Sequence, residues 1–110
     1  MTAAEYNITI DIYSDFSRTF QVKTDDVVTD LTGYNFAASL RENYNSTNSV
    51  DFTTSIVDAA QGLFKITLTD TVTSDMSPGD WRYDIVMITP TNDRVRLIEG
   101  AATLKRGITR

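Results

Sequence analysis

Carboxylates are the side chains of this sequence with the clearest potential for chemistry, because they recur in close groups. Asp25, Asp26 and Asp30 share one polar stretch, and several oxygen ligands close together can hold a hard cation such as Ca²⁺. The stretch lacks the Asp-x-Asp-x-Asp-Gly spacing of a calcium-binding loop. We therefore interpret it as a solvated acidic turn and expect no metal site.

Two further carboxylate pairs have a spacing that could serve acid–base catalysis, namely Asp11 with Asp15 and Asp80 with Asp84. A glycosidase needs its two carboxyl groups across a cleft, with the pKa of one of them raised, and nothing in the sequence indicates such a cleft. The chain also has no histidine and no cysteine, which removes the usual general base, Cys-ligated zinc and the common nucleophile arrangements. We expect a protein that is not an enzyme, with no cofactor and no small-molecule substrate.

The net charge of −5 opposes binding to nucleic acid and to anionic membranes, so neither is an expected partner. No apolar run approaches the ~20 residues of a membrane-spanning helix, and residues 1–5 do not resemble a signal peptide, which predicts folding in a cytoplasm. The basic residues concentrate in Lys105, Arg106 and Arg110, within a predicted tail over residues 105–110. This tail is either solvated or docked on an acidic neighbour.

The stretch 76–88 is the one around which the fold is expected to form. Its side chains alternate, with Trp81, Tyr83, Ile85 and Met87 on one side of a predicted strand. The opposite side also becomes apolar towards residue 88. This pattern predicts a strand in the middle of a sheet, lying across the core.

The rest of the chain predicts six more strands with turn signals between them, and the expected ranges are 6–13, 16–23, 34–40, 50–56, 64–69 and 94–104. Arg18 falls on the apolar side of its strand, so we place it at a sheet end with its head in water. A change of phase beside Gly100 predicts a β-bulge near Glu99, and residues 70–76 predict one helical turn with Val72 and Met76 on one face. Together these elements indicate a single domain over residues 1–110, an all-β antiparallel sandwich of about seven strands, with a β-barrel as the rival architecture.

Residues 41–49 have turn composition without periodicity, which predicts an exposed loop. Tyr44 lies in the middle of it and is the side chain there that could anchor a partner. With the basic tail, this gives a candidate protein interface, made of Tyr44, Lys105, Arg106, Ile108 and Arg110.

Three stretches of this sequence, taken in order, resemble a known group of proteins. They are residues 30–41 (Asp-Leu-Thr-Gly-Tyr, then Phe36 and Leu40-Arg41), residues 62–85 (Gly-Leu-Phe-Lys-Ile-Thr-Leu-Thr, then Ser-Pro-Gly-Asp-Trp-Arg-Tyr-Asp-Ile) and residues 96–110 (Arg-Leu-Ile-Glu-Gly, closing on Ile-Thr-Arg). The order is similar to that of small immunoglobulin-like β-sandwich structural proteins of tailed bacteriophages, the modules of tail, baseplate and fibre-attachment proteins.

The resemblance implies a non-enzymatic virion component, made in the host bacterial cytoplasm and assembled in multiple copies. Its expected partners are other virion proteins and further copies of itself. The expected position is a tail, baseplate or tail-fibre adaptor. Two alternatives stay open, a capsid decoration or cement protein that stabilises the head lattice, and a non-viral immunoglobulin-like binding module.

Overall fold

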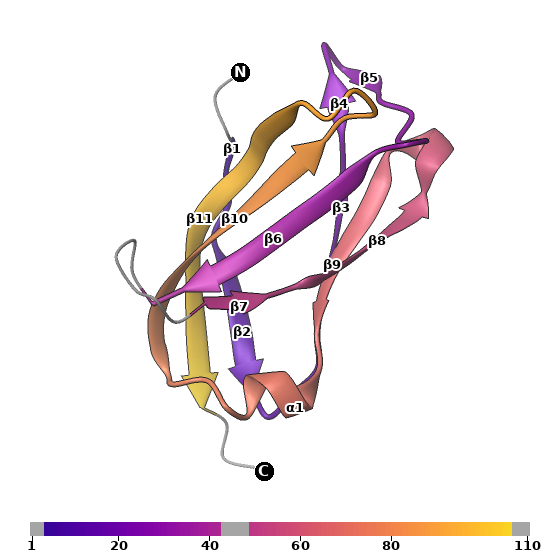
Figure 1. Ribbon diagram of the computed structural model, residues 1–110. Helices are drawn as coiled ribbons and strands as arrows, with labels where there is room; N and C mark the ends of the chain where they lie inside the picture. The colour runs from indigo at the N-terminus through magenta and orange to yellow at the C-terminus, as the bar shows by residue number, and fades with distance from the viewer. Residues whose placement is uncertain (1–3, 43–48, 107–110) are drawn as a thin grey trace.

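The computed structural model describes residues 4–42 and 49–106. Two β-sheets pack face to face, and a short hairpin projects from one end of the molecule (Figure 1). The elements follow one another in this order: β1 (Ala4–Glu5), β2 (Ile8–Ile12), β3 (Phe16–Gln21), β4 (Lys23–Thr24), β5 (Val27–Val28), β6 (Asn35–Arg41), β7 (Ser49–Asp51), β8 (Thr53–Asp58), the 3₁₀ turn η1 (Ala59–Gln61), β9 (Leu63–Leu68), α1 (Asp70–Thr73), β10 (Gly79–Ile88) and β11 (Arg94–Arg106).

The larger sheet has six strands in the order β1-β11-β10-β6-β7, and β2 follows β1 along the same side of β11. The smaller sheet has three strands in the order β3-β9-β8, and β4 pairs with β5 in the projecting hairpin. Seven of the described strands have five residues or more. The predicted all-β, immunoglobulin-like sandwich of about seven strands is therefore confirmed. It is antiparallel except at one edge, where β1 and β2 both run parallel to β11.

β10 occupies the place predicted for the central strand, between β11 and β6. Trp81, Tyr83, Ile85 and Met87 are buried, while the alternate residues of the strand are more exposed. The smaller sheet supplies Phe64, Ile66 and Leu68 to the same core. Alternation of apolar side chains on both sheets thus produces a core between two layers, as a sandwich requires.

The predicted strand over residues 50–56 is wrong in one respect, because the chain changes sheets within it. Val50 belongs to β7 of the larger sheet, whereas Thr54 and Ile56 belong to β8 of the smaller one. Phe52 lies at the crossing, where its side chain is buried and its N–H donates to the carbonyl of Ala38 at 2.9 Å. A period-2 pattern continues through such a crossing, so the sequence does not reveal it.

β11 also departs from the prediction. The bulge is at Leu97, which lies between the pairs Ile85–Ile98 and Val86–Arg96, and not at Glu99–Gly100. The strand then continues through Lys105 and Arg106, which pair with β2. Residues 105 and 106 were predicted as part of a tail, and they belong to a strand because β2 extends the sheet alongside β11.

Arg18 is not at a sheet end, as the sequence suggested. It lies in the middle of β3 opposite Ile66, and its Nη1 donates to the phenol oxygen of Tyr6 at 3.2 Å. Its guanidinium also lies 5.9 Å from the centre of the Phe16 ring. Since β3 and β1 are edge strands of different sheets, Arg18 and Tyr6 connect the two layers along one open side of the sandwich.

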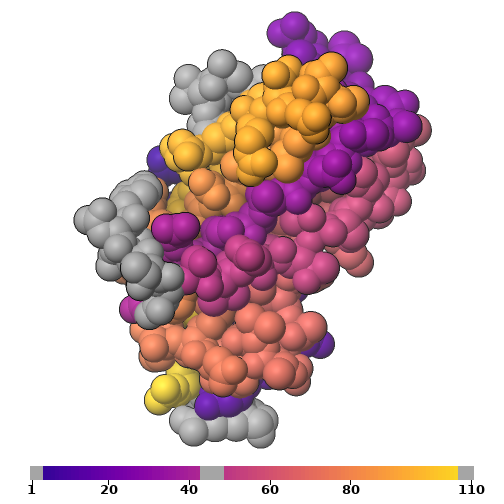
Figure 2. Space-filling model, viewed as in Figure 1, coloured from indigo at the N-terminus to yellow at the C-terminus, as the bar shows by residue number. Residues whose placement is uncertain are grey.

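The predicted helical turn is present as α1, at the end of the molecule opposite the projecting hairpin (Figures 1 and 2). The backbone N–H of Asp70 donates to the carboxylate of Asp15 at 2.7 Å, so a residue from another connection caps the turn. The turn ends at Thr73, so Val72 and Met76 do not share one helical face as predicted: Met76 is buried beyond the turn, Val72 is 37% exposed and Thr73 is buried. The Thr73 hydroxyl donates to the carbonyl of Ser14 at 3.0 Å, which satisfies it in the core.

Candidate functional site

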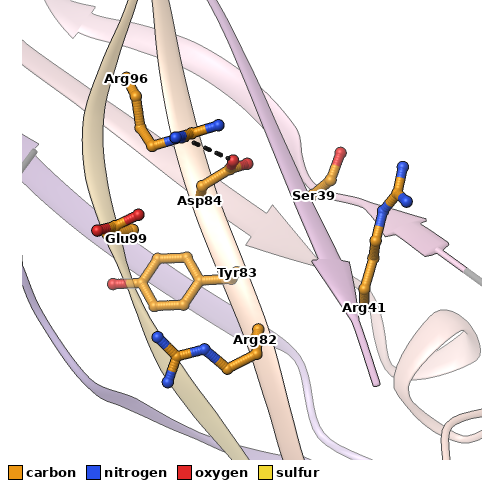
Figure 3. Close-up of a pocket in the computed structure, with 7 residues that line it drawn as sticks. All are labelled: Ser39, Arg41, Arg82, Tyr83, Asp84, Arg96 and Glu99. Atoms are coloured by element: carbon orange, nitrogen blue, oxygen red, sulfur yellow. Dashed lines mark hydrogen bonds and ion pairs between the residues drawn. The ribbon is translucent and has the colours of Figure 1, made fainter. Parts of the chain in front are cut away.

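An open groove of about 490 Å³ lies on the outer face of the six-stranded sheet, the face turned away from the smaller sheet (Figure 3). Strands β6, β10 and β11 contribute the side chains around it, and they are Ser39, Arg41, Arg82, Tyr83, Asp84, Arg96 and Glu99. Alternation explains the placement, because every second residue of a strand faces outward. On β10, burial of Trp81 and Tyr83 obliges Arg82 and Asp84 to point away from the core.

Strand register brings acidic residues into one line across this face. Glu5 is opposite Glu99, and Glu99 is opposite Asp84. Asp84 is also opposite Ser39 of β6, and Ser39 is in turn opposite Asp51 of β7. We call Glu5, Glu99, Asp84 and Asp51 the acidic row.

Arginines lie on both sides of the acidic row. Arg41 of β6 is directly opposite Arg82 of β10, two residues along the strands from Ser39 and Asp84. We call these two residues the arginine pair. Arg96 of β11 lies on the other side of the row, and Figure 3 shows it reaching back towards Asp84. The outer face therefore carries alternating bands of negative and positive charge.

Two polar contacts hold the acidic row within the sheet. Arg96 Nε and Asp84 Oδ2 form an ion pair at 3.2 Å, with side chains that are 58% and 37% exposed. Water screens such a pair, so it contributes about 0–1 kcal/mol to stability. The Ser39 hydroxyl donates to Asp51 Oδ1 at 2.7 Å. These contacts orient the two carboxylates, and charged groups of another molecule can still approach them.

Tyr83 lines the groove from beneath, and its phenol donates a hydrogen bond to the backbone carbonyl of Tyr6. Burial raises the pKa of Tyr83 to about 12, with a further rise from Tyr6 and an opposing effect of Arg18. The phenol is therefore protonated at neutral pH and remains a donor.

The described residues contain no group of three or more His, Cys, Asp or Glu arranged to hold a metal ion. What this arrangement offers chemically is ionic and hydrogen-bonded recognition.

The acidic stretch with Asp25, Asp26 and Asp30 forms the tip of the β4–β5 hairpin and the segment after it. Asp25 and Asp26 both have positive φ, as a two-residue hairpin loop requires. The Asp30 carboxylate accepts hydrogen bonds from the Thr32 hydroxyl at 2.7 Å and from the Thr32 N–H at 2.9 Å, and both lower the pKa of Asp30. The carboxylate of Asp30 thus has local structural partners.

A second groove, of about 440 Å³, lies beside α1 and the start of β10. Its lining combines acidic and apolar side chains, and the residues are Glu42, Val50, Thr71, Val72, Asp75, Met76, Ser77 and Trp81. The Trp81 indole N–H donates to the carbonyl of Ser77 at 3.0 Å, which satisfies the polar atom of this core residue.

The structure describes two of the five predicted interface residues. Lys105 and Arg106 are exposed at the end of β11, where Lys105 is opposite Asp11 of β2. Tyr44, Ile108 and Arg110 lie outside the described residues, so their predicted part in an interface stays a prediction. None of the helices in the described ranges is long and apolar enough to cross a membrane.

Of the residues around the outer-face groove, only Asp84 was a candidate from the sequence, in an acid–base pair with Asp80 that was set aside. Arg82 and Asp84 were visible as the outward side of the central strand, which was the available signal. The neighbours of these two residues, Arg41 and Glu99, come from strands about 40 and 15 residues away in the printed sequence. Only strand order and register bring them together.

Comparisons with known proteins place this chain in no established family. No family model matches it, and a search of curated proteins finds no match. Among solved structures it is similar to an internalin-like protein of Listeria monocytogenes, with 12% sequence identity, a TM-score of 0.46 and coverage of 96% of this chain and 28% of that one. It is also similar to AggA, the major subunit of aggregative adherence fimbriae type I of Escherichia coli, with 10% identity, a TM-score of 0.41 and coverage of 90% and 89%. Likeness at this level carries no argument about function.

Proposed function

We propose that this chain is a non-enzymatic structural protein of a tailed-bacteriophage particle, where it acts as a tail, baseplate or tail-fibre adaptor component in several copies. The observation that carries the proposal is the outer face of the six-stranded sheet. It presents charged groups of both signs on regular strands of a packed sandwich. A rigid face with patterned charge suits specific contact with another protein surface.

The stretches that carry the phage-protein resemblance support the proposal through their place in the fold. Leu31 is fully buried, and Gly62 ends the 3₁₀ turn in a left-handed conformation. Trp81 fills the core, and Gly100 allows the chain to pass close to Tyr6. The resemblance therefore concerns residues that define this sandwich, and such residues are the ones a shared module would retain.

The distribution of charge also supports a role in assembly. The chain is acidic overall, with a net charge of −5, yet three of its ten Lys and Arg residues line one groove. Charged interface groups act mainly by selecting partners and fixing their register. A component held at a defined place in a particle needs that selectivity.

The proposal is tested by locating the chain in purified phage particles. Mass spectrometry should detect its peptides in density-purified virions, and antibody-fragment labelling viewed by electron microscopy should mark the tail. A low copy number set by the cyclic symmetry of the tail is expected. Labelling spread over the head lattice would replace the proposal with the capsid-decoration alternative, and absence from the particles would overturn a virion role.

A further inference from the structure

We propose that the groove beside α1 binds residues 106–110 of a second copy of this chain, with Ile108 on the apolar floor and Arg106 and Arg110 against carboxylates at the rim. We call this cavity the α1 groove, and residues 106–110 (Arg-Gly-Ile-Thr-Arg) the basic segment. The inference rests on the proposed function for the expectation that several copies meet in one assembly. Residues 107–110 lie outside the described ranges, and only their side-chain types enter the proposal.

The floor of the α1 groove is apolar. Trp81 and Met76 form it from the buried core, and Val50 of β7 adds half-buried apolar surface. Val72 of α1 is an exposed apolar wall beside them. An apolar side chain of a partner would be removed from water here, as the anchor residues of protein interfaces are.

The rim of the α1 groove is acidic. Glu42 follows β6 on one side of the groove, and Asp75 follows α1 on the other. Both residues are exposed, and no hydrogen bond or ion pair joins either carboxylate to another described residue. The described residues around the groove include no Lys or Arg. The ligand that fits is therefore an apolar side chain with cations beside it.

The basic segment has this pattern. Ile108 lies between Arg106 and Arg110, two residues from each. Residues two apart in an extended chain point to the same side, so one face of the segment would present an apolar side chain between two cations about 13 Å apart. Burial of the isoleucine would supply affinity, and the two ion pairs would fix the register.

The fold favours the segment of another copy over the chain's own. Trp81 on the groove floor is opposite Ala102, and β11 runs on from there to Arg106, away from the floor. The far wall, at Val50, belongs to β7, which is separated from β11 by β10 and β6. To enter its own groove, the segment would have to reverse direction and cross the end of β10. A segment from a second copy can enter without that turn.

The segment and the α1 groove lie at the same end of the molecule. Figure 1 shows α1 and the end of β11 at the end opposite the projecting hairpin, and α1 contacts β2, whose last residue, Ile12, is opposite Arg106. A two-fold axis between segment and groove would place the segment of each copy in the groove of the other. Both contacts then form at once, as in the isologous interfaces of symmetric dimers.

Sedimentation velocity on the full chain tests this exchange of segments. The wild type should form dimers that weaken with added salt, because salt screens ion pairs at the rim. Ile108→Asp places a charge on the apolar floor and should raise the dimer dissociation constant by at least about tenfold. Glu42→Lys with Asp75→Lys should also weaken the dimer, and adding Arg106→Glu and Arg110→Glu should restore it with the signs exchanged.

Lys65→Asp is the matched control, since it reverses a charge on β9 of the smaller sheet and should leave dimerisation unchanged. Circular dichroism identifies any variant that fails to fold. If the double lysine variant does, Glu42→Gln with Asp75→Asn replaces it and should weaken the dimer without repulsion. A wild type that stays monomeric at low salt and high concentration would overturn the inference. So would an Ile108→Asp variant that dimerises as the wild type does.

Cysteine cross-linking identifies which copy supplies the segment, because the chain has no cysteine of its own. Thr71 is exposed at the α1 groove, and Thr109 is next to the proposed anchor. The double variant Thr71→Cys with Thr109→Cys should oxidise to a dimer linked between chains, and Lys65→Cys in place of Thr71→Cys should give little product. A disulfide within a single chain would show that the chain's own segment occupies the groove, and would refute the exchange.

The two proposals fail separately. A chain that is monomeric in solution, and still found in purified particles, refutes the exchange of segments and leaves the virion role. A chain that dimerises through the α1 groove, and is absent from particles, refutes the virion role and leaves the exchange.

Discussion

The carbonyl oxygen of Tyr6 lies so close to Gly100 that a β-carbon at position 100 would overlap it. The same carbonyl accepts the hydrogen bond from the Tyr83 phenol, and Tyr83 is directly opposite Gly100 in the β10–β11 ladder. Asn7 adds a side-chain contact, because its Oδ1 accepts from the N–H of Ala101 at 3.0 Å. These contacts fix the chain between β1 and β2, and so place Glu5 at the end of the acidic row.

Gly100→Ala should destabilise the fold, because the added methyl group meets a backbone oxygen that cannot move freely. We expect a loss of about 1–3 kcal/mol in the free energy of unfolding, the usual range for overpacking. Urea denaturation followed by the fluorescence of the single tryptophan, Trp81, measures it. Ala101→Ser adds one atom at the next residue, on the outer side, and should change stability by less than about 0.5 kcal/mol. Equal stability of the alanine variant and the wild type would contradict the close approach.

Tyr83→Phe removes the part-buried hydrogen bond from the phenol to the backbone carbonyl of Tyr6. The expected cost is about 0.5–1.5 kcal/mol of unfolding free energy, the usual net contribution of one hydrogen bond. Tyr34→Phe is the control, since Tyr34 packs against the core only partly buried, and should have a smaller effect. The prediction fails if the two variants are equally stable.

Tyr83 should also make folding sensitive to alkaline pH. Its pKa is raised to about 12 by burial, so the folded chain holds this proton more tightly than the unfolded chain, whose tyrosines titrate near pH 10. The stabilisation is complete below pH ~10 and is lost as the pH rises towards ~12. Denaturation curves between these values should show a steeper loss of stability for the wild type than for Tyr83→Phe. Parallel losses would show that Tyr83 is not the group responsible.

Trp81→Ala should be among the most damaging single changes, because the indole is only 5% exposed and its N–H is satisfied by Ser77. Large-to-small changes of buried aromatic residues cost about 3–5 kcal/mol. Asp80→Ala, at the exposed residue before it, should cost less than about 0.5 kcal/mol. Thermal unfolding followed by circular dichroism compares the two, and similar melting temperatures would contradict a core built on Trp81.

Much of the sandwich could be predicted from the sequence, because period-2 alternation is a local signal. The central strand, with Trp81 and Tyr83 inward, follows directly from that pattern. The failures occur where the decisive partner is distant along the chain. The chain crosses from one sheet to the other at Phe52 because β8 pairs with β9. Lys105 belongs to a strand because β2 lies beside β11. Neither pairing leaves a trace in the neighbouring residues.

The candidate site was harder to predict for the same reason. Arg82 and Asp84 face outward by alternation alone, but the pairing of Arg82 with Arg41 and of Asp84 with Glu99 depends on register. A bulge at Leu97 changes that register within β11, and a shift of one residue would move Glu99 off this face. Composition drew attention to the basic tail instead, of which the structure describes only Lys105 and Arg106.

The central claim is that this chain is held in a phage particle through the outer face of its larger sheet. Incorporation of the variant Arg41→Asp with Arg82→Asp tests it most directly, in phage whose own copy of the gene has been replaced. Quantitative mass spectrometry of purified particles should find this folded variant strongly depleted, and Lys65→Asp present at the wild-type level. Wild-type incorporation of the variant with both arginines reversed would contradict the claim.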